Sequence, residues 1–330
     1  MKFLISILLW LGVVSAIYGA AALVINPNQT GPLHVLPPVL LDDRIPKTDL
    51  FKKFASSGPV EGLVLGSSRA LTISPRAIAS LTGKRYFNFA VSAATISDDA
   101  DIYEEVLRNG AHPRHIVVGL DVEHMLGRRK VEERQMAIVN GAVVPRLAQG
   151  LLDVRSVFTA EYAHDMTMSV AFHAGLVPRK ISNNFDPAGT EIAHGSGLMS
   201  QEQFQAAVSG CTAKIHAQIA RYDMVSDLQF AGLKRLLTRA AADGAKVEMF
   251  TTPVIPMARP EIAAGTSYNS LREAAMLRLS LELERFHFSI HDLADTTALQ
   301  DGVAGWSDCV HYSEGNGDKI IREILSLGRD

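Results

Sequence analysis

Short apolar runs alternate with amphipathic segments along most of this chain. Five runs have the length and composition of buried strands, and they lie at 61–66, 85–91, 115–121, 246–252 and 288–293. Segments with apolar residues every three to four positions separate them and predict helices near 73–81, 97–109, 201–242, 270–286 and 315–327. Strands that alternate with helices indicate right-handed crossovers between parallel strands. The pattern therefore predicts an α/β fold with a central, mostly parallel sheet.

The first apolar run differs from the others, because no charged residue interrupts Phe3–Ile25. At about 23 residues, it is long enough to cross a hydrocarbon core of roughly 30 Å as a helix. Lys2 precedes the run and the next basic residue is Arg44, so the positive-inside rule puts the bulk of the chain outside the cytoplasm. We expect 1–25 to be a transmembrane anchor and the rest to be periplasmic or at the cell surface. A signal peptide cleaved near Ala20–Ala22 is the alternative.

The remaining chain divides into a linker and one large domain. Residues 26–60 contain six prolines and no sustained periodicity, which is typical of a linker. The predicted strands place an α/β domain at 61–330. Between 122 and 245 the strand pattern is interrupted by helical segments and a polar loop. A break this long usually marks a functional insertion, so we expect a helical insertion there.

The composition limits the classes of partner and cofactor that we expect. The 330 residues are 47% hydrophobic and 20% charged, with a formal net charge of -3, so nothing indicates a nucleic-acid partner. No Gly-rich phosphate loop or Cys-x-x-Cys is present, and we expect no nucleotide, metal or other cofactor. Cys211 and Cys309 could pair in an oxidising compartment, but the sequence does not show that they are close.

Candidate chemistry begins in Gly66–Arg69, which reads Gly-Ser-Ser-Arg at the end of the first strand. A serine on such a loop can act as a nucleophile where an imidazole takes its proton and a carboxylate holds that imidazole. Asp308 and His311 lie three residues apart before the last helix and can supply both groups from one loop.

These two motifs together resemble blocks I and V of the SGNH/GDSL hydrolase superfamily. The membrane-anchored envelope branch, with the alginate O-acetylation proteins and the D-alanyl-lipoteichoic acid accessory protein, is the more similar part of it. The resemblance covers roughly 61–121 and 246–328. It implies a three-layer sandwich with flavodoxin-like strand order. By position it makes Ser68 the nucleophile, His311 the base and Asp308 the partner that orients the base.

Two other blocks depart from the family pattern. The stretch that matches block II, Asn88–Ala93, has no glycine. The resemblance still implies an oxyanion donor from the backbone between Ala90 and Ser92, beside the N–H of Ser68. Block III has Asp121 where the family has an asparagine. An ionised aspartate can only accept hydrogen bonds, so it cannot replace that donor.

Arg69 follows the candidate nucleophile directly and is a candidate partner for Asp121 if the two strand ends are adjacent. An ion pair between them would position the serine loop and present a guanidinium to an anionic substrate or to the oxyanion. A solvated arginine is the simpler alternative.

The resemblance implies a tethered serine esterase or O-acyltransferase that acts on acyl groups of cell-envelope glycans. Its partners would be the membrane, an envelope glycan or acyl donor, and a membrane acyltransferase. An inactive SGNH-like scaffold or binding module in an envelope assembly is the second hypothesis, since block III lacks its asparagine. A purely structural α/β protein is the third, and it predicts that Ser68, Asp308 and His311 lie far apart.

Overall fold

The computed structural model describes residues 2–25, 43–129, 158, 160–176, 185–192, 199–286, 288–294 and 296–327. The chain divides into two compact units. The larger comprises Arg44–Met136 and Asn183–Asp330, and the smaller comprises Met1–Asp43 and Ala137–Ser182. All candidate site residues lie in the larger unit.

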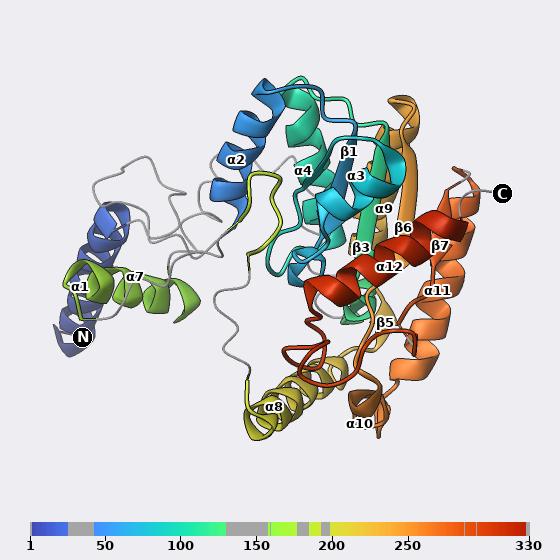
Figure 1. Cartoon of the computed structure of the whole chain (residues 1–330). Helices are drawn as coiled ribbons and strands as arrows, with labels where there is room; N and C mark the ends of the chain where they lie inside the picture. The colour runs from blue at the N-terminus through green and yellow to red at the C-terminus, as the bar shows by residue number, and fades with distance from the viewer. Residues whose placement is uncertain are drawn as a thin grey trace. The chain divides into compact units, whose positions relative to one another are not determined.

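In the described part of the larger unit, five parallel strands form one sheet (Figure 1). They are β1 (Gly62–Gly66), β2 (Tyr86–Asn88), β3 (His115–Leu120), β6 (Lys246–Thr251) and β7 (Ser289–His291). Their order is β2-β1-β3-β6-β7, which is the flavodoxin-like order. The strand order reverses between β1 and β3, and ligands bind at the carboxyl ends of strands at such a point. The predicted α/β fold with a parallel sheet is confirmed.

Helices cover both faces of the sheet, because side chains alternate along each strand. Leu63 and Leu65 pack on the face covered by α2 (Arg44–Ser56), α4 (Ile96–Arg108), α9 (Asp227–Ala242) and α11 (Tyr268–Glu284). Val64 packs on the face covered by α3 (Pro75–Thr82), α8 (Gln201–Ile219), α10 (Arg259–Ala263) and α12 (Glu314–Leu327). The larger unit is therefore a three-layer sandwich.

One of these helices occupies part of the stretch 26–60, which its sequence indicates to be a linker. α2 buries Phe51 completely in the core of the sandwich. The Nζ of Lys47 is also buried and donates to the backbone oxygen of Asn88 at 2.9 Å. The prolines of this stretch conceal the helix in the pattern, although a proline in the first turn sacrifices no intrahelical hydrogen bond. The α/β unit thus includes α2.

Part of the predicted insertion at 122–245 also belongs to the sandwich. α9 packs against α4, buries Leu233 and Leu237, and leads into β6 as a crossover helix. Near its start, β5 (Met224–Val225) pairs antiparallel with β4 (Leu126–Gly127). Residues 130–157, 159, 177–184 and 193–198 of the predicted insertion lie outside the described residues.

The smaller unit contains α1 (Lys2–Ile25) and α7 (Ala160–His173). Ala22, Tyr162 and Met166 form a small buried cluster between them, and the Tyr162 hydroxyl donates to the Ala22 backbone oxygen at 3.5 Å. The predicted insertion therefore supplies a helix that packs on the N-terminal one. Within the ranges that the structure describes, no helix combines the length and hydropathy required to cross a membrane.

Candidate active site

The candidate nucleophile lies on a tight turn directly after β1. Ser68 begins a short 3-10 helix, η1 (Ser68–Ala70). Ser67 caps this helix, because the Ser67 hydroxyl accepts a hydrogen bond from the Arg69 N–H at 3.2 Å. Gly66 precedes this turn with a φ of 135°, where a Cβ would come within 2.8 Å of the Gly119 oxygen. Only glycine fits this close approach of two strands, so the turn is fixed where β1 and β3 end.

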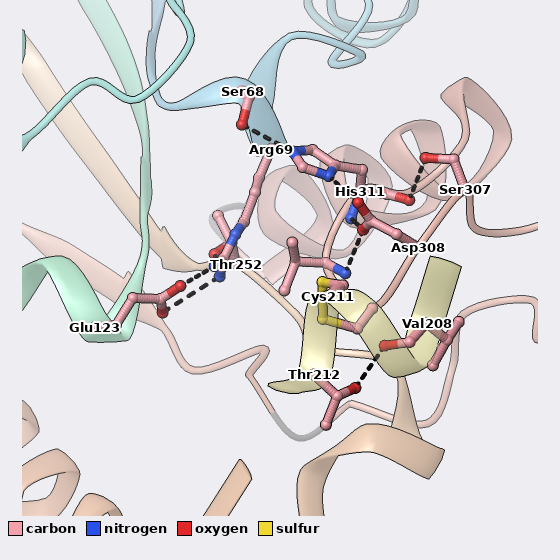
Figure 2. Close-up of a disulfide and its surroundings, with 12 residues drawn as sticks. Ser68, Arg69, Glu123, Val208, Cys211, Thr212, Thr252, Ser307, Asp308 and His311 are labelled. Atoms are coloured by element: carbon pink, nitrogen blue, oxygen red, sulfur yellow. Dashed lines mark hydrogen bonds and ion pairs between the residues drawn. A yellow bond between two sulfur atoms is a disulfide. The ribbon is translucent and has the colours of Figure 1, made fainter. Parts of the chain in front are cut away.

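Ser68, His311 and Asp308 form one hydrogen-bonded chain (Figure 2). The Ser68 Oγ lies 2.8 Å from the His311 Nε2, and the His311 Nδ1 lies 2.7 Å from the Asp308 Oδ2. The other Asp308 oxygen accepts the N–H groups of Val310 and His311, each at 2.8 Å. The His311 side chain is 39% exposed, so the chain is open to a ligand.

The environment of Asp308 keeps its carboxyl ionised. Burial raises its pKa, but the hydrogen bond and charge of the His311 ring and the two backbone N–H groups outweigh burial. The pKa of Asp308 therefore lies below its ordinary value. An ionised carboxylate on Nδ1 holds the Nδ1–H tautomer, which leaves Nε2 to take a proton from Ser68.

A disulfide joins this loop to the insertion. Cys309 lies between Asp308 and His311 and is bonded to Cys211 of α8, with the two Cα atoms 5.7 Å apart (Figure 2). The sequence leaves the pairing of these cysteines open. In the structure the link anchors the Asp308–His311 turn to α8, 98 residues earlier in the chain.

The block II stretch holds the serine turn from the side. The Asn88 side chain is fully buried and donates to the backbone oxygens of Ala70 and Ile73, each at 2.8 Å. Its own oxygen accepts the Ala90 N–H at 2.9 Å. Ala90 is therefore not placed to be the oxyanion donor implied by the resemblance, because its N–H is already used within the fold.

Ser92 and Ala93 follow Ala90 along the same turn. Ser92 is half-buried, and Ala93 has a φ of 56°, the only positive φ of a non-glycine residue among the described residues. The left-handed region costs alanine of order 1 kcal/mol or more, and such conformations concentrate at functional sites. Ala93 is the last residue of the stretch that matches block II and lacks a glycine, and its sequence alone gives no sign of this conformation.

Arg69 is not solvated, since its side chain is 6% exposed. Its Nε lies 3.6 Å from the Asp121 Oδ1, so the two strand ends are adjacent. Its main partner is Glu123, which the sequence does not reveal: both guanidinium Nη atoms donate to the Glu123 carboxylate, and Nη1 also donates to the Thr252 hydroxyl at 3.1 Å. Figure 2 shows this guanidinium directed away from the Ser68 Oγ, so it is not presented to a substrate.

Asp121 is buried with the same cluster. Burial raises its pKa, but the charges of Arg69 and His124 and the hydroxyls of Ser67 and Thr252 outweigh burial, so that its pKa lies below the ordinary value. The Thr252 hydroxyl donates to Asp121 at 2.7 Å. Asp121 is thus an acceptor with partners, and it supplies no donor to an oxyanion.

Asp99 is a second carboxyl that pattern reasoning overlooks, since it lies among the acidic residues expected at a helix start. It is buried in the first turn of α4. Burial and the nearby Asp98 raise its pKa well above the ordinary value, and the N–H of Gly66 offsets this only in part. Asp99 therefore takes up its proton at a higher pH than an ordinary aspartate does.

No protein-family model and no curated protein matches this sequence. Similar solved structures are SGNH and GDSL-type hydrolases. A proposed acylhydrolase from Bacteroides fragilis shares 11% identity at a TM-score of 0.41, covering 84% of this chain and 91% of that one. A GDSL-like lipase from Bacteroides thetaiotaomicron shares 11% at 0.38, covering 85% and 97%. An extracellular lipase from Streptomyces rimosus shares 12% at 0.38, covering 81% and 99%.

Similarity at this level does not carry an activity from one protein to another. The function of this chain has to be inferred from its own side chains, and above all from the hydrogen-bonded Ser68, His311 and Asp308.

Proposed function

We propose that this protein is a serine esterase or O-acyltransferase that acts on acyl groups of cell-envelope glycans. The observation that carries the proposal is the unbroken hydrogen-bonded chain from the Ser68 Oγ through the His311 ring to the Asp308 carboxylate. Residues 243 positions apart meet with the geometry that nucleophilic serine chemistry requires. A purely structural protein would have no reason to bring them together.

In the proposed reaction, the Ser68 Oγ attacks the acyl carbonyl carbon while its proton moves to the His311 Nε2. Asp308 stabilises the imidazolium that forms. The oxyanion is bound by the backbone N–H groups of Ser68 and Ala93. Ala93 here takes the role of oxyanion donor that the resemblance assigns to the backbone between Ala90 and Ser92. His311 then protonates the leaving oxygen, and an acyl group stays on Ser68. Water or a sugar hydroxyl, activated by His311, completes hydrolysis or transfer.

The envelope setting is part of the proposal. The uncharged run at Phe3–Ile25 supports a tether that holds the sandwich outside the cytoplasm. The Cys211–Cys309 disulfide supports an oxidising compartment, where such bonds persist. The glycan substrate and a membrane acyltransferase as acyl donor follow from the family resemblance alone.

Labelling with a fluorophosphonate probe tests the proposal, because this probe reacts with activated serines. The wild-type chain is expected to label and to hydrolyse p-nitrophenyl acetate, whereas Ser68→Ala does neither. Ser80→Ala is the matched control, since it removes an exposed serine hydroxyl of α3 that bonds only to the Ala77 backbone oxygen and leaves the turn of Ser68 unchanged. Equal labelling of the wild type and Ser68→Ala would rule out the serine-enzyme proposal.

One observation favours the alternative, an SGNH-like scaffold without catalytic activity. Asp121 occupies the block III position as a buried acceptor, and losing one oxyanion donor costs about 10²–10³ in rate in a well-studied protease. A wild-type chain that folds and fails to label would support this alternative.

A further inference from the structure

We propose that Glu123 is a positioning residue for the nucleophile: it fixes Arg69, and Arg69 fixes the turn that carries Ser68. The inference rests on the proposed function, because it gives Glu123 a role behind a reactive serine. Glu123 itself lies away from the Ser68 Oγ, on the far side of the guanidinium (Figure 2).

The contacts of Arg69 join three chain segments just beyond the ends of their strands. Arg69 belongs to η1, directly after Ser68. Glu123 belongs to η2 (Val122–Met125), which follows β3, and its carboxylate accepts hydrogen bonds from both guanidinium Nη atoms. Thr252 follows β6 and accepts from the same Nη1 at 3.1 Å. A two-pronged arginine–carboxylate pair defines direction as well as distance, so this pair fixes how η1 sits against η2.

Asp121 cannot replace Glu123 in this role. Its Oδ1 lies 3.6 Å from the Arg69 Nε, and the same oxygen accepts the Thr252 hydroxyl at 2.7 Å. Its other oxygen lies 3.5 Å from the His124 Nδ1. Without the Glu123 charge, the nearly fully buried guanidinium would keep only the Asp121 carboxylate, 3.6 Å from its Nε, and would lose its two-pronged contact. A buried charge is stable only when paired and hydrogen-bonded. The Arg69 side chain would then move, and the turn with it.

Movement of this turn affects the reaction directly. The backbone bonds of η1 lie within the turn itself: the Ala70 N–H donates to the Ser67 oxygen at 3.0 Å, and the Leu71 N–H to the Ser68 oxygen at 3.3 Å. Side chains attach the turn to the rest of the fold, Asn88 at Ala70 and Arg69 beside Ser68. The Ser68 Oγ must stay 2.8 Å from the His311 Nε2. A misplacement of about 1 Å in an active site can cost roughly 10² in rate.

The expected signature is a loss of rate without a loss of substrate binding. In Glu123→Gln, which keeps the side-chain shape and removes the charge, we expect kcat for p-nitrophenyl acetate and the second-order rate of fluorophosphonate labelling to fall by roughly 10- to 100-fold. KM should stay within about twofold, because Glu123 does not contact the substrate. Glu123→Asp keeps the charge and should lose less.

Glu248→Gln is the matched control. Glu248 is also a nearly fully buried carboxylate with cationic partners, but it lies at the amino end of β6, at the opposite edge of the sheet. Its substitution should lower the melting temperature and leave the labelling rate within about twofold of the wild type. All variants are made in the full chain, and melting is followed by circular dichroism.

The outcomes separate this inference from the proposed function. A wild-type chain that does not label overturns both. A wild type that labels, with Glu123→Gln labelling at the same rate, overturns the positioning role alone. Equal slowing in Glu123→Gln and Glu248→Gln would also overturn it, since the effect would then be general destabilisation. If Glu123→Gln does not fold, Arg69→Lys decides, because it keeps the positive charge and removes the two-pronged contact with Glu123: a folded variant with the wild-type labelling rate rejects the role.

Discussion

Two clusters of buried charge lie at opposite edges of the same sheet. At the carboxyl edge, Arg69 is surrounded by Glu123 and Asp121. At the amino edge, the His115 Nε2 lies 3.2 Å from the Glu248 Oε2. Each cluster places a nearly fully buried carboxylate beside basic side chains. By burial and pairing alone, either one is a candidate functional site.

The two clusters differ in the secondary structure that carries their residues. Tyr86, His115, Lys246 and Glu248 at the amino edge are all strand residues, whose backbone is held by ladder hydrogen bonds. Tyr86 reaches the His115 Nδ1 across β1 at Gly62, where any Cβ would collide with its ring. This cluster adds stability to a position that the sheet already fixes.

The carboxyl-edge cluster stands beyond the ladder, in η1, in η2 and directly after β6. Side-chain contacts therefore set the backbone there, next to the proposed nucleophile. We expect comparable burial to have different consequences: contacts at one edge should affect stability alone, whereas contacts at the other should affect stability and reactivity.

The largest expected effect tests whether chemistry is confined to the carboxyl edge. Asp308→Asn keeps the size of the side chain but no longer holds the His311 ring in the Nδ1–H tautomer. We expect kcat to fall by about 10³–10⁴, as the equivalent change does in a serine protease. Steady-state hydrolysis of p-nitrophenyl acetate measures this, with circular dichroism to show that the variant is folded. Full activity in Asp308→Asn would remove the carboxylate from the mechanism.

An intermediate effect is expected for the disulfide, which belongs to the carboxyl edge. Replacing Cys211 and Cys309 together by alanine should lower the free energy of unfolding by about 2–4 kcal/mol. It should also reduce kcat by roughly tenfold, because the turn of Asp308 and His311 loses its covalent anchor. Urea unfolding and kinetics measure the two effects. Lower stability with unchanged kcat would mean that hydrogen bonds suffice to hold the turn.

No effect on activity is expected from a substitution at the amino edge. There, pH should change the stability of the fold. Burial raises the pKa of Glu248, but hydrogen bonds and charges of His115 and Lys246 lower it to about 2. Since the folded-state pKa is below the ordinary value of 4.5, the ionised form stabilises the fold above that pH and loses this contribution between pH 4.5 and about 2.

Urea unfolding from pH 7 to pH 3 measures this difference. The wild type should lose stability more steeply than Glu248→Gln as the pH falls below 4.5. Parallel pH profiles would show that the His115–Glu248 pair contributes nothing to stability. A change in kcat at neutral pH would contradict the separation of the two edges.

Most of the sheet can be predicted from the sequence, because strand composition and strand ends are local properties. The positions of Ser68 and of Asp308 with His311 can also be read from it, because each follows a motif placed at the end of a predicted element. The sequence makes the pairing of Arg69 with Asp121 conditional on adjacent strand ends, and the structure supplies that condition, since β1 and β3 are paired and end at the same edge.

Glu123 and Asn88 could not be found in this way. Each is a single polar residue without a motif, and its role depends on contacts with residues distant in the chain. The burial of Arg69 is likewise a three-dimensional property, since three strand ends have to enclose the guanidinium. The conformation of Ala93 contradicts its local preference, and only the fold around it explains why an alanine takes a positive φ.

The separation of Ser68 and His311 by 243 residues has a consequence for the synthesis of this protein. Ser68 leaves the ribosome 243 residues before His311. The hydrogen bond between them can form only after the chain has been translated through His311 and this later segment has docked. A chain truncated before Asp308 would carry Ser68 without the base and the carboxylate proposed for it. Probe reactivity of Ser68 is thereby a read-out of completed folding.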